Sequence, residues 1–293
     1  MNDNELLAER FEAHRSHLRS VAYRMLGSLA EAEDAVQEAW LRLSRSDTSD
    51  VENLGGWLTT VVGRVCLDML RSRTSRREDP LDVHVPDPIV GSIEGTDPEH
   101  EAMVTDSVGL AMLVVLDTLA PAERLAFVLH DMFAVSFDEI APIVGRTPAT
   151  ARQLASRARR RVGAAPVPDP DLARQREVVD AWVAATRGGE FDALLSLLDP
   201  DVVLRVDGGV LAAGATKLVR GAESVAGQAL MYQRFAPYGR VALVNGLPGL
   251  VSLPEGKPTA VMSFTVSGGK VVQLDILADP ERLRELDLSV LGD

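Results

Sequence analysis

Residues 136–162 carry the signals of two consecutive helices with a tight turn between them, which restricts the folds open to this part of the chain. Ser136 and Glu139 have the spacing of a capping box, so a helix is expected to begin directly after Ser136. Gly145 is suited to end that helix, and the Thr-Pro pair at 147–148 is typical of the start of another. Two helices separated by about three residues predict a helix-turn-helix.

The second helix of this pair is small on one side and basic on the other. Its expected packed side is formed by residues at three- and four-residue steps, which are Ala151, Ala155, Ala158 and Val162. The side chains expected to point outward are Arg146, Thr150, Arg152, Gln153, Arg157 and Arg160. Such a helix suits a DNA major groove, where arginine contacts phosphates and arginine or glutamine reads base edges. A solvated basic hairpin is the alternative interpretation.

The distribution of charge matters more here than its sum. The net charge of −13 argues against nucleic acid as a partner, but no lysine or arginine lies between Arg77 and Arg124, where acids are frequent. Arginines gather instead at 71–77 and 157–161. Because DNA responds to charge within about 10 Å, these clusters remain compatible with DNA binding. At 293 residues the chain has room for two or three domains.

Cysteine usage and hydropathy limit the compartment and the chemistry. Cys66 is the only cysteine, which excludes a disulfide framework and a cysteine-based zinc site, and we expect neither metal nor cofactor. The N-terminal MNDNELLAER is acidic and lacks the apolar core of a signal peptide. No segment approaches the ~20 apolar residues that a membrane helix needs. We therefore expect a cytoplasmic protein without a membrane partner.

Three helices are predicted near the N-terminus, at 6–25, 28–43 and 57–73. The second buries a stripe at Ala32, Val36, Ala39 and Leu43 and leaves Glu33, Asp34, Gln37 and Glu38 away from it. The third carries Arg64, Asp68 and Arg71 opposite its apolar side, followed by Arg73, Arg76 and Arg77. A solvated acidic face and an exposed ion-pair ladder are the alternative interpretations of these two patterns.

Proline, glycine and acids dominate residues 78–98, which we interpret as a linker, and residues 164–170 form a shorter one. Between them, helices are predicted at 101–119 and 121–133, before the helix-turn-helix. The remaining chain predicts an α+β domain, with helices at 172–186, 191–198 and 222–235. Its expected strands end or begin at Asp207-Gly208-Gly209, Asn245-Gly246 and Gly268-Gly269. We expect these helices to pack on one curved antiparallel sheet.

These features together resemble a sigma factor of the extracytoplasmic-function type. The resemblance rests on EAEDAVQEAWLRL at 31–43, WLTTVVGRVCLDMLRSR at 57–73, LAPAERLAFVLHDMF at 119–133 and TARQLASRARRR at 150–161. It implies two all-α sigma modules, region 2 at 1–77 and region 4 at 99–163, joined by the acidic linker. The linker would run through the RNA exit path of RNA polymerase, which suits a flexible segment.

The resemblance also assigns roles to particular residues. Glu33, Asp34, Gln37 and Glu38 would bind the β′ clamp of core RNA polymerase. Arg64, Asp68, Arg71, Arg73, Arg76 and Arg77 would engage the −10 element of promoter DNA, and Arg146, Thr150, Arg152, Gln153 and Arg157 the −35 element. Arg64 departs from the family, since many relatives carry asparagine there. The implied partners are core polymerase, through its β′ and β subunits, and promoter DNA.

The C-terminal part, 172–293 after the linker at 164–171, resembles the SnoaL-like extension of one subgroup of these sigma factors, a cone-shaped α+β domain. The matching motifs are DGGV at 207–210 and NGLPG at 245–249, although Val210 and Leu211 replace the glycine and lysine that usually follow. In this subgroup the extension regulates the sigma modules in cis, which implies no obligate anti-sigma factor and a monomer when free. The implied regulatory contacts are Asp207, Gly208, Gly209, Asn245, Gly246, Pro248 and Gly249. For NGLPG, a loop that needs Asn-Gly for positive φ is the alternative.

Two other function classes remain open at this point. SnoaL-like folds host isomerases and cyclases, but all five histidines precede residue 131, so only Asp207 and Asp275, with Tyr232 and Tyr238, would be available for acid/base chemistry. A ligand-sensing cavity without chemistry is favoured over an enzyme. A one-component helix-turn-helix regulator is the other class, but it leaves the helices at 28–43 and 57–73 unexplained.

Overall fold

A computed structural model describes residues 3–46, 51, 53–76, 83–93, 109–209 and 216–291 of the chain. Contacts between its parts divide the chain into two compact units, one made of residues 1–79 and 115–164 and the other of residues 80–114 and 165–293. Each unit is therefore built from two separate stretches of sequence.

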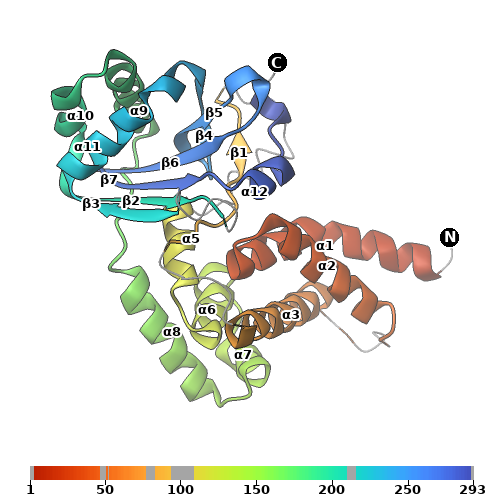
Figure 1. Cartoon of the computed structure of the whole chain (residues 1–293). Coiled ribbons are helices and arrows are strands. Elements are labelled where there is room, and N and C mark those ends of the chain that lie inside the picture. Colours follow the sequence, from red (N-terminus) through yellow and green to blue (C-terminus); the bar gives the residue numbers. More distant parts are fainter. Residues whose placement is uncertain are drawn as a thin grey trace. The chain divides into compact units, whose positions relative to one another are not determined.

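The first unit begins with helices α1 (Asp3–Leu26), α2 (Leu29–Leu43) and α3 (Leu54–Arg76), which pack against one another (Figure 1). Ser28 caps α2, because its side chain accepts a hydrogen bond from the backbone N–H of Glu31. The predicted stripe Ala32, Val36, Ala39 and Leu43 is buried, as the sequence pattern indicated.

The unit continues with α6 (Pro121–Phe127), a π-helical turn (Val128–Met132), α7 (Phe137–Val144) and α8 (Pro148–Val162). Helix α3 packs against α6 and α7, and a Cβ at Gly63 would lie 3.6 Å from Leu125 Cδ1 of α6 and 3.1 Å from Leu129 Cδ1 of the π-helical turn. Arg124 is 2% exposed and donates two hydrogen bonds to the carbonyl oxygen of Arg24, at 3.1 and 3.0 Å. Its Nη1 also pairs with Asp117. The short helix α5 (Leu110–Asp117) contains the point where the chain enters this unit.

The second unit contains one mixed sheet, with the order β1-β4-β5-β6-β7-β2-β3 among the described residues. The strands are β1 (Val90–Gly91), β2 (Leu198–Asp207), β3 (Lys217–Arg220), β4 (Gly239–Val244), β5 (Leu247–Ser252), β6 (Ala260–Ser267) and β7 (Lys270–Leu277). The pair β2–β7 is parallel and every other described pair is antiparallel, so the prediction of a wholly antiparallel sheet was wrong at that pair. A parallel pair forms between strands that are distant in sequence, and local pattern does not reveal it.

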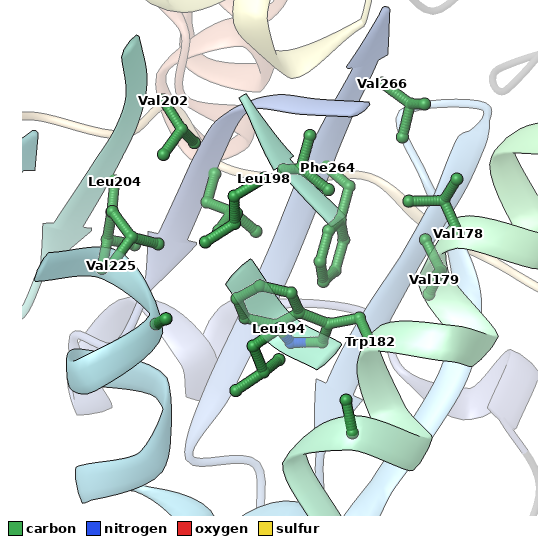
Figure 2. Close-up of a cluster of buried hydrophobic side chains, with 14 of the residues drawn as sticks. Val178, Val179, Trp182, Leu194, Leu198, Val202, Leu204, Val225, Phe264 and Val266 are labelled. Carbon is green, nitrogen blue, oxygen red and sulfur yellow. The ribbon is translucent and has the colours of Figure 1, made fainter. Parts of the chain in front are cut away.

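Helices α9 (Leu172–Gly188), α10 (Phe191–Leu197) and α11 (Ala222–Met231) cover one face of this sheet (Figure 1). Trp182 of α9 points toward Phe264 of β6, with ring centroids 5.7 Å apart in an edge-to-face arrangement (Figure 2). Valine and leucine side chains from both layers surround this pair and complete the core. The last helix, α12 (Pro280–Glu285), follows β7. The predicted α+β class is confirmed.

Residues 83–93, which we name the linker segment, are ordered in the second unit, where the sequence predicted part of a flexible linker. Val85, Ile89 and Val90 are buried, and β1 pairs with β4 through Val90 opposite Val244 and Gly91 opposite Leu243. Proline is common in linkers, but it also favours an extended backbone and is tolerated in the edge strand of a sheet. Val90 and Gly91 of the segment thus form an edge strand of the sheet.

Candidate DNA-binding and regulatory sites

Helices α7 and α8 form the helix-turn-helix that the spacing predicted. The Ser136 hydroxyl accepts from the N–H of Glu139 at 3.3 Å, and the Glu139 carboxylate accepts from the N–H of Ser136 at 3.1 Å, which completes the capping box. Gly145 has a φ of +67°, which ends α7 in the left-handed conformation. Thr147 then caps α8 by accepting from the N–H of Thr150 at 3.3 Å.

The outer face of α8 is basic and open. Ala151, Ala155 and Ala158 are buried, while Val162 is only half-buried. Arg146, Arg152, Gln153, Arg157 and Arg160 are exposed and Thr150 is half-buried, as the periodicity predicted. Arg159 is held by Asp131 at 2.6 Å, and the predicted contact residue Arg152 lies 5.2 Å from the centroid of the Phe137 ring. Helix α8 carries no acid of its own, but Glu123 of α6 lies 3.9 Å from Arg157 and 3.8 Å from Arg161.

The predicted DNA-binding residues of helix α3 include exposed side chains and one arginine that is paired within the protein. Arg64, Asp68 and Arg71 are exposed, and Arg71 lies 3.8 Å from Asp68. Arg73 instead donates to Glu31 at 3.1 Å and to the carbonyl oxygen of Leu26 at 3.1 Å, so its guanidinium joins α3 to the preceding helices. A DNA contact by Arg73 stays a prediction and would require its guanidinium to leave Glu31. Arg77 and the side chain of Arg76 lie outside the described residues.

A hollow beside α3 collects further basic residues that the sequence analysis did not assign to DNA. It is lined by Arg42, Arg45, Ser46, Trp57, Thr60, Val61 and Arg64, and we name it the α3 hollow. Arg42 pairs with Glu38 at 3.0 Å. An aromatic ring among guanidinium groups is the combination that binds unstacked bases and their phosphates. The sequence signal was weak, because α2, its following turn and α3 each contribute only part of the set.

The predicted polymerase-binding residues of α2 differ in exposure. Asp34 and Gln37 are exposed. Glu33 is half-buried and pairs with Arg15 and, at 3.9 Å, with Arg19, both on α1. Glu38 is half-buried and paired with Arg42. Of the four predicted residues, Asp34 and Gln37 are therefore the two that are exposed.

Asp207, at the end of β2, binds the linker segment. Its Oδ2 accepts hydrogen bonds from the N–H of Val85 and from Arg282 Nη1, both at 2.9 Å, and lies 3.2 Å from His84 Nδ1. Burial alone would raise the pKa of this carboxyl, but the hydrogen bonds from His84 and Val85 and the charge of Arg282 lower the pKa to about 2. Asp207 is thus an anion at neutral pH and anchors a segment more than a hundred residues away in sequence.

Arg282 on α12 completes this contact, and the sequence analysis did not find it. It donates to the carbonyl oxygen of Val85 at 2.6 Å and to Asp87 at 2.7 Å, in addition to Asp207. A planar guanidinium is suited to bridging two carboxylates in this way. The contact is therefore an arginine between two partly buried acids, one from each stretch of the unit.

Asn245 makes the second contact with the linker segment. Its Oδ1 accepts from the N–H of Ile89 at 3.0 Å, and its backbone N–H donates to the Ile89 carbonyl oxygen at 2.8 Å. Asn245 has a φ of +49° and Gly246 of +79°, which fits a tight hairpin turn between β4 and β5. The turn interpretation of NGLPG is confirmed, and the same asparagine also binds the linker segment within its own unit, while a regulatory role of this contact stays a prediction.

The glycines of the two motifs are required by space as well as by conformation. A Cβ on Gly249 would lie 2.6 Å from both Met262 O and Val244 Cγ2. Gly209 has a φ of +69° and would meet the carboxylate of Asp279, which caps α12. Gly208 donates to the Thr216 hydroxyl at 3.1 Å, and Pro248 is buried. A change of Gly249 would therefore disturb the sheet, whereas Asn245 offers the cleaner test of the contact.

The Sigma-70 region 2 family matches residues 10–76 and the Sigma-70 region 4 family matches residues 110–162. The ECF RNA polymerase sigma factor SigJ of Mycobacterium tuberculosis is 43% identical over 288 residues, covering 93% of this chain and 91% of that protein. This chain belongs to the ECF RNA polymerase sigma factors. A probable ECF sigma factor SigI of the same species is 34% identical over 294 residues, with full coverage of both chains.

A crystal structure of Mycobacterium tuberculosis SigJ supports the same assignment over the whole fold. It matches with a TM-score of 0.78 at 38% identity and covers 96% of this chain and 100% of that one. The similarity therefore extends through the SnoaL-like domain. As an ECF sigma factor, the protein binds core RNA polymerase and promoter DNA and initiates transcription; the one-component regulator is not favoured.

The two family matches assign the candidate DNA-binding sites to sigma regions. The α3 hollow lies within region 2, and α7 and α8 lie within region 4. In the described residues of this sigma factor no helix is long and apolar enough to cross a membrane. The same residues contain no cluster of three metal-ligating side chains of the His, Cys, Asp or Glu type.

The C-terminal domain contains a cavity of about 310 Å³, and the carboxylates considered for catalysis do not line it. Asp207 binds the linker segment, and Asp275 is buried beside Arg205 and Gln273, whose Nε2 donates to it at 2.7 Å. Tyr232 lines the cavity, but Tyr238 is not among its lining residues. The four residues are therefore not gathered into one acid/base site.

Proposed function

We propose that this sigma factor is controlled in cis through the contact between its SnoaL-like domain and the linker segment. The observation that carries the proposal is the pair of anchors at Asp207 and Asn245, which hold Val85 and Ile89 by their backbone groups. Since the linker segment lies between regions 2 and 4 in sequence, its attachment limits the paths the connection can follow. Release of the segment would free the two regions to reach their promoter elements together.

The DNA contacts proposed for region 4 rest on the exposed face of α8. Arg146, Arg152 and Arg157 would bind phosphates or guanines of the −35 element, with Thr150 and Gln153 beside them. This assignment is supported by the exposure of the arginines and of Gln153 and by the absence of acids on α8, although Arg157 would have to leave Glu123, 3.9 Å away.

In region 2, Arg64, Asp68 and Arg71 would engage the −10 element, with Arg76 and Arg77 following. We add Arg42, Arg45 and Trp57 of the α3 hollow, where an unstacked base would lie against the indole while guanidinium groups hold the backbone. Arg42 would have to leave Glu38 to take part, and Arg73 would have to leave Glu31.

For core polymerase, Asp34 and Gln37 are the better exposed members of the proposed docking face on the β′ clamp, while Glu33 and Glu38 would have to leave their arginine partners. The β subunit is the partner proposed for region 4.

We propose further that the free protein is a monomer, acts in the cytoplasm at the polymerase, catalyses no reaction and needs no obligate anti-sigma factor. The covalently attached domain would supply the control.

Transcription in vitro with purified core polymerase tests the cis control. The full chain is compared with its Asn245→Ala variant and with Asp201→Ala, an exposed acid of the same domain that is not part of the contact. A change in promoter-dependent RNA from Asn245→Ala alone, with unchanged binding to core polymerase, supports the proposal and gives its sign. Equal transcription from all three folded proteins would remove it while leaving the sigma function intact.

A further inference from the structure

The SnoaL-like domain encloses a cavity of about 310 Å³ between its sheet and the helices α9 and α11. Most of its wall is apolar and includes Trp182, Leu204, Leu274 and Ala229. The volume lies at the lower end of the range in which proteins bind small molecules. At roughly 30 Å³ for a water-sized group, the space suits a ligand of about ten non-hydrogen atoms.

Strand pairing places one charged group at the end of an apolar row. Across β5, β6, β7, β2 and β3 the paired residues are Leu250, Met262, Ile276, Val206 and Lys217. Directly paired residues in neighbouring strands point to the same face, and all five line the cavity. The row therefore runs from an apolar floor to a single ammonium group at its β3 end.

Polar groups accompany Lys217 at this end. Lys217 Nζ lies 5.2 Å from the centroid of the Tyr232 ring, and Gln228 precedes Tyr232 by one helical turn. The cavity is lined by no Asp, Glu or His, and Lys217 has no ion pair with a described carboxylate. Other polar lining groups are satisfied locally, since Thr186 donates to the Trp182 carbonyl oxygen and Thr259 to the Ser252 hydroxyl. Lys217 is thus the charge in the wall that a ligand would meet.

We propose that this cavity binds a small monocarboxylic acid with an apolar body, its carboxylate at Lys217 and its body against Trp182 and the sheet. An anion is favoured because the partly buried ammonium lacks a counter-charge among the described residues. The apolar wall supplies the remaining affinity by removing the body of the ligand from water. A cation would be repelled, and a neutral molecule of the same shape would leave Lys217 unpaired.

Octanoate is a suitable probe, since its ten non-hydrogen atoms match the space. Isothermal titration calorimetry on the full chain is expected to give saturable binding of octanoate. Binding of 1-octanol is expected to be about tenfold weaker or more, and octylammonium is expected not to bind. Absence of saturable octanoate binding, or equal affinity for octanoate and 1-octanol, would overturn the proposal.

Two variants and a control locate the site. Lys217→Gln is expected to weaken octanoate binding about tenfold and to leave 1-octanol binding unchanged. The control Lys257→Gln, at an exposed lysine that does not line the cavity, is expected to bind like the unmodified chain. Ala229→Trp is expected to fill the cavity and abolish binding of both. Thermal unfolding verifies that each variant is folded. Octanoate affinity that survives Lys217→Gln would place the carboxylate elsewhere and contradict the assignment.

Discussion

The carboxylate of Asp207 and the backbone N–H of Val85 are joined by a 2.9 Å hydrogen bond, although 122 positions separate them in the chain. Arg282 binds both partners at once, through the Asp207 carboxylate and the Val85 carbonyl oxygen. An anchor of this kind attaches a connecting segment to a folded domain through its backbone. The side chains of His84 and Asp87 strengthen this backbone anchor, through Asp207 and Arg282 respectively.

Replacing Asp207 by alanine is expected to destabilise the SnoaL-like domain by about 2–3 kcal/mol, since a carboxyl whose pKa lies near 2 contributes about that much at neutral pH. Arg282 would in addition lose one of its two carboxylate partners. Urea denaturation of the full chain measures the change. Asp201→Ala, an exposed acid on the same strand, is expected to change stability by less than about 0.5 kcal/mol.

The same carboxyl predicts a particular pH dependence. Its pKa is about 2 in the folded protein and about 3.9 in an unfolded chain, so its contribution is complete above pH 5 and is lost as pH falls from about 4 to 2. The stability difference between the unmodified chain and Asp207→Asn is therefore expected to be constant from pH 8 to 5 and to shrink below pH 4. Chemical denaturation across this pH series measures it. A difference that changes between pH 6 and 8 would point to another titrating group.

Arg124 is expected to be a major source of stability in the first unit. Arg124→Met leaves Asp117 without its guanidinium and the Arg24 carbonyl oxygen without two donors, which is expected to cost about 3–5 kcal/mol. Denaturant unfolding is the measurement, with the exposed Arg160→Met as the matched control. Adding Asp117→Asn to Arg124→Met is expected to recover part of the loss, because it removes the buried charge. Strict additivity of the two changes would count against a direct interaction.

The outer face of α8 gives a prediction in terms of salt. Arg157→Ala is expected to weaken binding of the polymerase holoenzyme to promoter DNA and to lower the slope of log affinity against log salt by about 1. Gln153→Ala is expected to change discrimination at one base pair by about 1–3 kcal/mol with little change in slope. Arg176→Ala on α9, which removes an arginine outside region 4, serves as the control. An unchanged slope for Arg157→Ala would exclude a phosphate contact.

The α3 hollow predicts a defect in promoter opening. Arg45→Ala and Trp57→Ala are expected to reduce formation of the open complex several-fold, while binding to core polymerase stays unchanged. Fluorescence of 2-aminopurine placed in the −10 element reports the opening. Arg10→Ala, an exposed arginine on α1, controls for loss of charge. Normal opening by Trp57→Ala would show that the hollow does not receive a base.

Local signals in the sequence were sufficient for the helical part. The capping box at Ser136, the left-handed Gly145 and the alanine stripe of α8 all act within a few residues, and all are present in the structure. The same holds for Gly268-Gly269, whose positive φ values of 60° and 73° make the turn between β6 and β7. Such features depend on backbone conformation and spacing, which a single stretch of sequence contains.

The sequence by itself determined the helix-turn-helix and the α+β class of the C-terminal domain, because both follow from local periodicity, caps and turns, and its motifs carried the resemblance that indicated the family. Tertiary structure alone decided that β2 and β7 are parallel, that Arg73 pairs with Glu31 and that Arg282 joins Asp87 to Asp207. It also decided that Val90 and Gly91, which lie in a stretch predicted to be a linker, form an edge strand of the sheet. These contacts form between residues that are distant in sequence. The free energy of burial and pairing that stabilises them produces no periodic pattern in either segment, so the sequence of one segment does not predict them.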